Sequence, residues 1–112
     1  MLQEYRRGLA AGELRYQRCA DCDHAQFPPR VICARCGGGE LVWSTSDGRG
    51  TVYSVSWLSP RDTAPYNVAL IDLADGFRML ATVSGVDPDD ALIGRSVRAA
   101  VVDEVVRFET AS

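Results

Sequence analysis

Four cysteines in two close pairs constrain this chain more than any other feature. They are the only cysteines in the sequence, and each pair has the spacing C-x-x-C: Cys19 with Cys22, and Cys33 with Cys36. Each C-x-x-C can form a knuckle that directs both sulfurs to one point, and two knuckles supply the four thiolates of a tetrahedral site. The spacing therefore predicts a zinc ribbon with these four cysteines as metal ligands.

The expected zinc is structural, because four protein ligands leave no open position for a substrate or a water molecule. Iron in the same sulfur cage is the main alternative, and a redox-active dithiol is a more distant one. His24, the only histidine, lies two residues after Cys22. Because the cysteines already complete the ligand set, we expect His24 to be a loop residue or a hydrogen-bond donor to a ligand.

Length and hydropathy indicate one compact unit with a small addition. The chain has 112 residues, of which 46% are hydrophobic, enough for one core. No stretch approaches the roughly 20 apolar residues that cross a bilayer, and the first residues lack the apolar run of a signal peptide. We therefore expect a cytoplasmic protein without membrane contact, whose thiols stay reduced and bind metal rather than form disulfides.

The segment before the first cysteine has helical periodicity. Leu2, Tyr5 and Leu9 are spaced by three and four residues, which places them on one apolar stripe. Gly12 would end this helix. We expect a docking helix rather than a separate domain.

After the ribbon the apolar period changes to two, which is typical of strands. The segment GTVYSVSWLS alternates and would place Tyr53, Val55 and Trp57 on one side of a strand. The segments YNVALIDL and RMLATVSGV lie on either side of Asp75 and Gly76, a pair that favours a hairpin turn.

A proline and several acidic residues in DPDDALIG then interrupt the strands. Asp87 would cap a short helical turn that Gly94 closes. SVRAAVV and VVRFET resume the strand pattern on either side of Asp103 and Glu104. Five strands with a helical insertion between the third and fourth predict a closed Greek-key barrel of the OB type.

The expected fold class is therefore mainly β. A docking helix occupies residues 1–14, a four-cysteine zinc ribbon residues 15–42, and a five-stranded OB-fold barrel residues 43–112.

The order of these segments resembles a family of small accessory proteins that combine a zinc ribbon with an OB-fold. The resemblance covers nearly the whole chain and rests on the succession GELRYQRCADC, CARCGG, GRGTVYSV, PYNVALIDL and LIGRSVRA. Members of that family accompany enzymes that act on acyl-CoA esters: thiolases, thiolase-like aldolases, acyltransferases and hydratases. The resemblance implies an accessory subunit, possessing no catalytic residues, in a hetero-oligomer with such an enzyme.

One position departs from the family pattern. Asp23 follows Cys22 where such ribbons usually carry glycine. We expect a slightly different turn at that knuckle and no loss of the metal.

The inventory of catalytic side chains agrees with an accessory role. The chain has one histidine, no lysine and no cysteine outside the ribbon, whereas nucleophilic or acid-base catalysis needs a base within reach of a nucleophile or substrate. Asp72 and Asp75 would lie near each other at a hairpin end, but a solvated structural role is the more common one for such acids. A stand-alone hydrolase or redox protein would need chemistry from His24 or the ribbon thiols.

A nucleic-acid-binding protein is the alternative from another class, because zinc ribbons and OB barrels both occur there. Residues 1–36 carry six arginines and four acids, whereas residues 37–112 carry six arginines and eleven acids. The barrel is therefore acidic, which opposes the neutralisation of phosphates that such binding requires. Four thiolates around one zinc ion add a charge of about −2 to the basic part.

Five residues are candidates for contact with a partner or with acyl-CoA: Phe27, Arg30, Tyr53, Trp57 and Tyr66. Aromatic residues are enriched at the centres of protein interfaces, and core packing is the alternative for each. A guanidinium suits the phosphates of coenzyme A. For the ribbon arginines, screening of the anionic zinc site is the favoured alternative: Arg15, Arg18, Arg30 and Arg35.

The sequence thus predicts a noncatalytic subunit that binds and stabilises a thiolase-superfamily or related acyl-CoA enzyme. It would also help to shape the route by which the acyl-CoA substrate reaches the active site of that enzyme.

Overall fold

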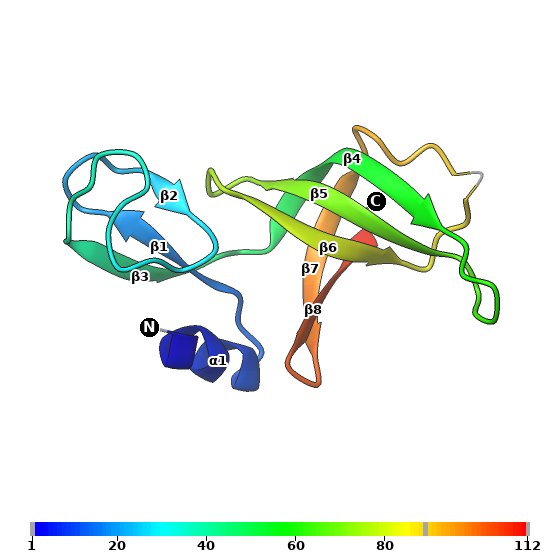
Figure 1. The fold of residues 1–112 in the computed structure, drawn as a ribbon, viewed down its shortest axis with the longest axis horizontal. Coiled ribbons are helices and arrows are strands. Elements are labelled where there is room, and N and C mark those ends of the chain that lie inside the picture. Colours follow the sequence, from blue (N-terminus) through cyan, green and yellow to red (C-terminus); the bar gives the residue numbers. More distant parts are fainter. Residues whose placement is uncertain (1, 89, 112) are drawn as a thin grey trace.

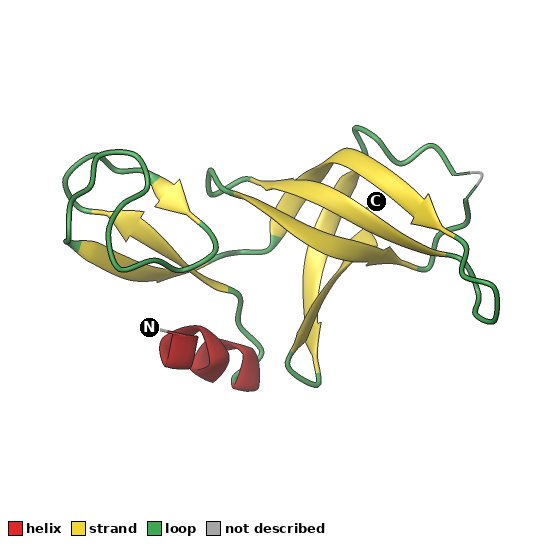
Figure 2. Ribbon diagram, viewed as in Figure 1, coloured by secondary structure: helices red, strands yellow, loops and turns green. Residues whose placement is uncertain are grey.

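A computed structural model describes residues 2–88 and 90–111; Met1, Asp89, Ser112 and the side chain of Leu2 lie outside the described part. One helix precedes a three-stranded sheet and a five-stranded barrel (Figures 1 and 2). The elements are α1 (Leu2–Ala10), β1 (Arg15–Cys19), β2 (Ala25–Gln26), β3 (Leu41–Thr45), β4 (Arg49–Leu58), β5 (Tyr66–Leu73), β6 (Arg78–Ser84), β7 (Ser96–Val102) and β8 (Val105–Thr110). The predicted fold class is confirmed. Within the described residues, no helix has the length and apolar character needed to span a membrane.

Helix α1 ends in the way that its sequence predicts. The N–H of Gly12 donates to the carbonyl of Leu9 (3.0 Å), and the N–H of Glu13 donates to the carbonyl of Gly8 (2.7 Å). This pair of bonds is the Schellman motif, which needs a left-handed residue after the helix, and Gly12 has φ of 78°. The helix lies beside the ribbon sheet (Figure 1).

The ribbon is built on a sheet that the sequence analysis did not predict. Strand β1 lies in the centre, with the two-residue β2 on one side and β3 on the other, both antiparallel to it. These strands are too short for their apolar residues to show a clear alternation with a period of two. Strand β3 pairs with β1 along its whole length up to Thr45, so the ribbon sheet extends past residue 42.

The five remaining strands close into a barrel in the order β4-β5-β6-β8-β7. All neighbouring pairs are antiparallel except β6 and β8, which run parallel, and this topology is that of an OB-fold. The predicted hairpin at Asp75 and Gly76 is confirmed, because it joins β5 to β6. The N–H of Gly76 donates to the carbonyl of Leu73 (3.0 Å) in this turn.

A bulge in β4 changes which of its side chains face the core. The pairing with β5 shifts between Val52 and Ser54, so that Tyr53 is the extra residue. Val52 is buried before the bulge, and Val55 and Trp57 pack against the core after it, whereas Tyr53 is 53% exposed. The prediction that Tyr53 and Trp57 share one face is therefore wrong, because the bulge breaks the alternation of two.

Between Asp87 and Gly94 the predicted helical insertion is reduced to single turns: the N–H of Asp90 donates to the carbonyl of Asp87 (3.0 Å), and Asp89 lies outside the described residues. The described residues of this segment form turns and bends instead of a helix. The N–H of Gly94 donates to the carbonyl of Val52 in β4 (2.8 Å), and Leu92 is buried in the core. These two interactions hold the segment against the barrel.

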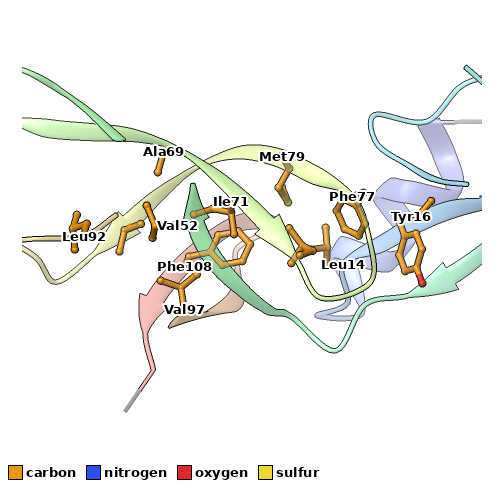
Figure 3. Close-up of a cluster of buried hydrophobic side chains, with 13 residues drawn as sticks. Leu14, Tyr16, Val52, Ala69, Ile71, Phe77, Met79, Leu92, Val97 and Phe108 are labelled. Atoms are coloured by element: carbon orange, nitrogen blue, oxygen red, sulfur yellow. The ribbon is translucent and has the colours of Figure 1, made fainter. Parts of the chain in front are cut away.

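One hydrophobic core runs from the barrel into the ribbon (Figure 3). Its largest fully buried side chains in the barrel are Val52, Ile71, Val83, Leu92, Val97 and Phe108. At the other end Leu14 and Tyr16, from the ribbon side, meet Phe77 after the β5–β6 turn.

Aromatic rings join the helix, the ribbon and the barrel. Phe77 stacks on Tyr16 with ring centroids 4.8 Å apart and on Phe27 with centroids 5.7 Å apart. Phe27 in turn meets the ring of Tyr5 from α1, edge to face, at 5.4 Å. Each such pair contributes about 0.5–1.5 kcal/mol beyond the burial of its surface, so the ribbon and barrel are not independent.

Candidate metal centre

The structure brings the four predicted ligands together. The sulfur atoms of Cys19, Cys22, Cys33 and Cys36 all lie within 4.8 Å of one another. Two pairs are 3.6 Å apart, Cys19 with Cys36 and Cys22 with Cys33. A tetrahedral zinc site with bonds of about 2.3 Å has sulfur separations of about 3.8 Å. The four thiols therefore fit a single tetrahedral ion.

The two knuckles have matching backbone geometry. The N–H of Asp23 donates to the carbonyl of Cys19 (2.8 Å), and the N–H of Gly37 donates to the carbonyl of Cys33 (2.9 Å). Asp23 and Gly37 both have a left-handed backbone, with φ of 63° and 78°. The expectation of a different turn at Asp23 is therefore corrected, because aspartate is one of the few residues other than glycine that tolerates this conformation.

Backbone N–H groups point at the sulfurs of the second knuckle. Arg35 donates to the sulfur of Cys33 and Gly38 donates to the sulfur of Cys36, each at 3.4 Å. Donation from the backbone of Cys36 and of Arg35 lowers the pKa of Cys33 to about 6. Since the thiolate is the form that binds metal, Cys33 is ready to act as a ligand at neutral pH.

Cys22 shows the opposite effect. A bond from the backbone of His24 lowers its pKa, but burial and the neighbouring sulfurs of Cys36, Cys33 and Cys19 outweigh this and raise it to about 12. Four crowded sulfurs resist ionisation as a group unless a cation offsets their charge. Metal binding at this site would therefore release protons.

His24 contributes to the centre through its main chain. Its carbonyl accepts a hydrogen bond from the N–H of Cys19 (2.9 Å), which closes the first knuckle. The gathered ligand atoms belong to the four cysteines, and the imidazole is not among them.

Two of the ribbon arginines are engaged away from the sulfurs. Arg15 forms an ion pair with Glu4 of α1 (2.6 Å). Arg18 donates to the carbonyls of Asp23 (3.0 Å) and Asp75 (2.8 Å), and so connects the first knuckle to the β5–β6 turn. These contacts attach the helix and the barrel to the ribbon, and screening of the metal centre by the ribbon arginines stays a prediction.

The predicted contact residues lie in different environments. Phe27 and Trp57 are half-buried and pack against the hydrophobic core. Tyr53 and Tyr66 are 53% and 46% exposed on the barrel, and Arg30 is exposed in the ribbon. The structure thus does not gather the five into one surface, and their contact role stays a prediction.

The two aspartates considered for acid-base chemistry bind different partners. Asp72 forms an ion pair with Arg78 at 2.5 Å, and this guanidinium also lies 3.7 Å from the ring centre of Tyr53. The carboxylate of Asp75 accepts a hydrogen bond from the hydroxyl of Ser46.

Two buried residues of the ribbon are not apparent from the sequence. Gln17 and Gln26 are each 4% exposed and lie opposite each other on β1 and β2. Their amides bond to the backbone on either side of Cys33, Gln17 to the carbonyl of Arg30 and Gln26 to the N–H of Ala34. No periodic signal marks them, because their burial follows from pairing between strands that the sequence pattern did not reveal.

Comparisons with known proteins cover both parts of the fold. Residues 6–42 match the model of the ChsH2 rubredoxin-like zinc ribbon domain, and residues 43–102 match that of the ChsH2 C-terminal OB-fold domain. The chain is 37% identical over 100 residues to the 3-oxo-4,17-pregnadiene-20-carboxyl-CoA hydratase alpha subunit of Mycobacterium tuberculosis, covering 86% of this chain. It is 34% identical over 86 residues to a DUF35 domain-containing scaffold protein of Methanothermobacter thermautotrophicus, covering 71% of this chain.

The chain spans 32% of the hydratase subunit and 65% of the scaffold protein. Among solved structures, it superposes on a chain of the Ltp2-ChsH2(DUF35) aldolase with a TM-score of 0.82 and 28% identity, covering 98% of this chain and 94% of the other. The chain therefore belongs to the ChsH2 family, in which a rubredoxin-like zinc ribbon precedes a C-terminal OB-fold domain.

Proposed function

We propose that this chain is a noncatalytic accessory subunit of an acyl-CoA enzyme of the thiolase superfamily, or of a related aldolase or hydratase. It binds and stabilises that enzyme and helps to shape the route of the acyl-CoA substrate. The observation that carries the proposal is the superposition over 98% of the chain on part of the Ltp2-ChsH2(DUF35) aldolase. The relatives named as a scaffold protein and as a hydratase subunit support it.

The side chains of the described residues support placing the chemistry in the partner. The only histidine serves a knuckle through its backbone, and the four cysteines converge on one point. Asp72 and Asp75 bind Arg78 and Ser46 instead of forming a carboxylate pair. General acid-base catalysis needs such groups to be free to reach a substrate.

The proposal includes a structural zinc ion held by Cys19, Cys22, Cys33 and Cys36. The sulfur separations fit this ion, and the matched family model is described as a zinc ribbon. Zinc in a closed site contributes folding free energy and no reaction step. Reduced thiols are required, which supports a cytoplasmic location.

The test is co-expression with the acyl-CoA enzymes encoded in its native host, followed by size-exclusion chromatography and metal analysis. We expect the chain to co-elute with a thiolase-like, aldolase or hydratase subunit and to contain zinc rather than iron. Elution of the chain apart from every such enzyme would contradict the proposal, as would turnover of an acyl-CoA ester by the chain alone.

Binding to single-stranded DNA and RNA at low salt tests the nucleic-acid alternative. Fluorescence anisotropy would detect even nonspecific binding there, and such binding would weaken steeply as salt is added. We expect no such binding, because residues 37–112, which follow the last cysteine, carry eleven acids and six arginines.

A further inference from the structure

The ribbon exposes two adjacent branched apolar side chains directly before a metal ligand. Val31 is 75% exposed and Ile32 is 55% exposed, and Cys33 follows them. A single exposed apolar residue is ordinary on a protein surface. Two neighbours on one loop, residues 29–34, need a further explanation because burial would lower their free energy.

The buried glutamines hold this loop in place. Gln17 accepts a hydrogen bond from the N–H of Arg30 (2.7 Å) and donates to the carbonyl of the same residue (3.0 Å). Gln26 accepts from the N–H of Ala34 (2.9 Å) and donates to Gln17 (3.1 Å) and, at 3.5 Å, to the carbonyl of Ile32. Both ends of the loop are therefore bonded to side chains from the ribbon sheet.

A buried amide network of this kind determines geometry more than it adds stability. Burying an amide costs free energy that its hydrogen bonds only offset, and an apolar pair of similar shape would be about as stable. Satisfied polar networks instead rigidify and specify one arrangement. The loop is thus preorganised, so that binding through it would lose little conformational entropy.

The charge around the loop indicates what kind of surface fits it. Residues 24–39 contain two arginines, Arg30 and Arg35, and no aspartate or glutamate; the carboxylate of Asp21, from the first knuckle, lies beside Gly38. Both arginines are exposed, and a surface hollow of about 550 Å³ lies against the loop and Gly37. A complementary partner would present an apolar socket with carboxylates at its rim.

We infer that residues 29–34 form the surface that docks the acyl-CoA enzyme, with Val31 and Ile32 entering an apolar socket. Arg30 and Arg35 would face carboxylates at the edge of that socket. The inference rests on the proposed function, because it assigns a surface to the same partner. It also differs from the five contact residues predicted from the sequence, of which only Arg30 belongs to this surface.

The test compares two single variants of the full chain against the enzyme subunit that co-elutes with the wild type. Ile32→Asp places a charge in the expected socket and should weaken binding by at least about tenfold. Leu80→Asp is the matched control, because Leu80 is 64% exposed on β6 of the barrel. It should bind like the wild type. Zinc content and melting temperature should match the wild type for both variants.

If Ile32→Asp alters the zinc content, Ile32→Ser replaces it as a milder change at the same exposed position. Wild-type affinity of the Ile32 variant, or an equal loss for Leu80→Asp, would overturn the inference while leaving the proposed function intact. A wild-type chain that binds no acyl-CoA enzyme would instead overturn the proposed function. Self-association of the chain that Ile32→Asp abolishes would assign the loop to a second copy and would also overturn the inference.

Discussion

The ribbon and the barrel bury different kinds of side chain. The barrel fills its interior with apolar side chains, of which the largest fully buried ones are Val52, Ile71, Val83, Leu92, Val97 and Phe108. The ribbon instead buries thiols and amides, which belong to Gln17, Cys19, Gln26 and Cys33. Short strands cannot enclose a sizeable apolar core, so the ribbon instead relies on four convergent thiols, which we propose hold zinc, and on a polar network.

The two regions are nevertheless joined. Phe77 of the barrel stacks on Tyr16 and Phe27 of the ribbon, and Arg18 donates to the carbonyl of Asp75 across the junction. We therefore expect the ribbon to be sensitive to loss of the metal and the barrel to loss of apolar side chains. One aromatic cluster should couple the stability of the two regions.

Removal of the metal should produce the largest effect and should separate the two regions. Apparent zinc-binding free energies of about 10–16 kcal/mol in ribbon-sized domains exceed what the ribbon could gain from packing alone. With a strong chelator, or in Cys19→Ser, we expect the ribbon amides to lose protection in hydrogen exchange while the barrel amides keep theirs. Acidification should act in the same direction, because protonation of the thiols competes with the metal. Ribbon amides that remain protected after metal loss would contradict this difference.

Phe108→Ala should affect the barrel and leave the metal centre in place. The side chain is 0% exposed, and removal of a buried phenylalanine typically costs about 3–5 kcal/mol. Urea denaturation followed by circular dichroism measures this loss, and metal analysis of the folded variant should find zinc unchanged. Phe108→Leu serves if the alanine variant does not fold. Loss of zinc from the folded Phe108→Ala variant would show that the two regions are not separable.

Phe77→Leu should have the smallest effect and tests the junction. Leucine keeps most of the apolar volume but removes two aromatic pairs, which predicts a loss of about 1–2 kcal/mol. The melting temperature should fall, and exchange of the ribbon amides should become faster. Leu80→Ala on the exposed face of β6 is the control, with an expected change near zero. An unchanged melting temperature for Phe77→Leu would mean that the aromatic cluster does not couple the regions.

Local features could be predicted because they need only a few consecutive residues. The spacing of the four cysteines predicted ligands that converge within 4.8 Å, and Gly12 predicted the end of α1. Asp75 and Gly76 predicted the turn between β5 and β6. Except for the meeting of the two cysteine pairs, the residues that determine the geometry are neighbours along the chain.

Features that depend on distant partners could not be predicted. The bulge at Tyr53 depends on how β4 pairs with β5, and the path of the segment around Leu92 depends on its bond to β4. The roles of Gln17 and Gln26 depend on pairing between β1 and β2. These residues have no distinguishing pattern in the sequence.

The sequence by itself determined the class of this protein: a four-cysteine ribbon, a barrel of five strands and a scarcity of catalytic side chains. Cysteine spacing and apolar periodicity encode those properties locally, so they can be predicted without knowledge of the tertiary contacts. Only the tertiary structure decided which surface is held rigid and which aromatic rings are exposed, because both depend on groups far apart in the chain that folding brings together.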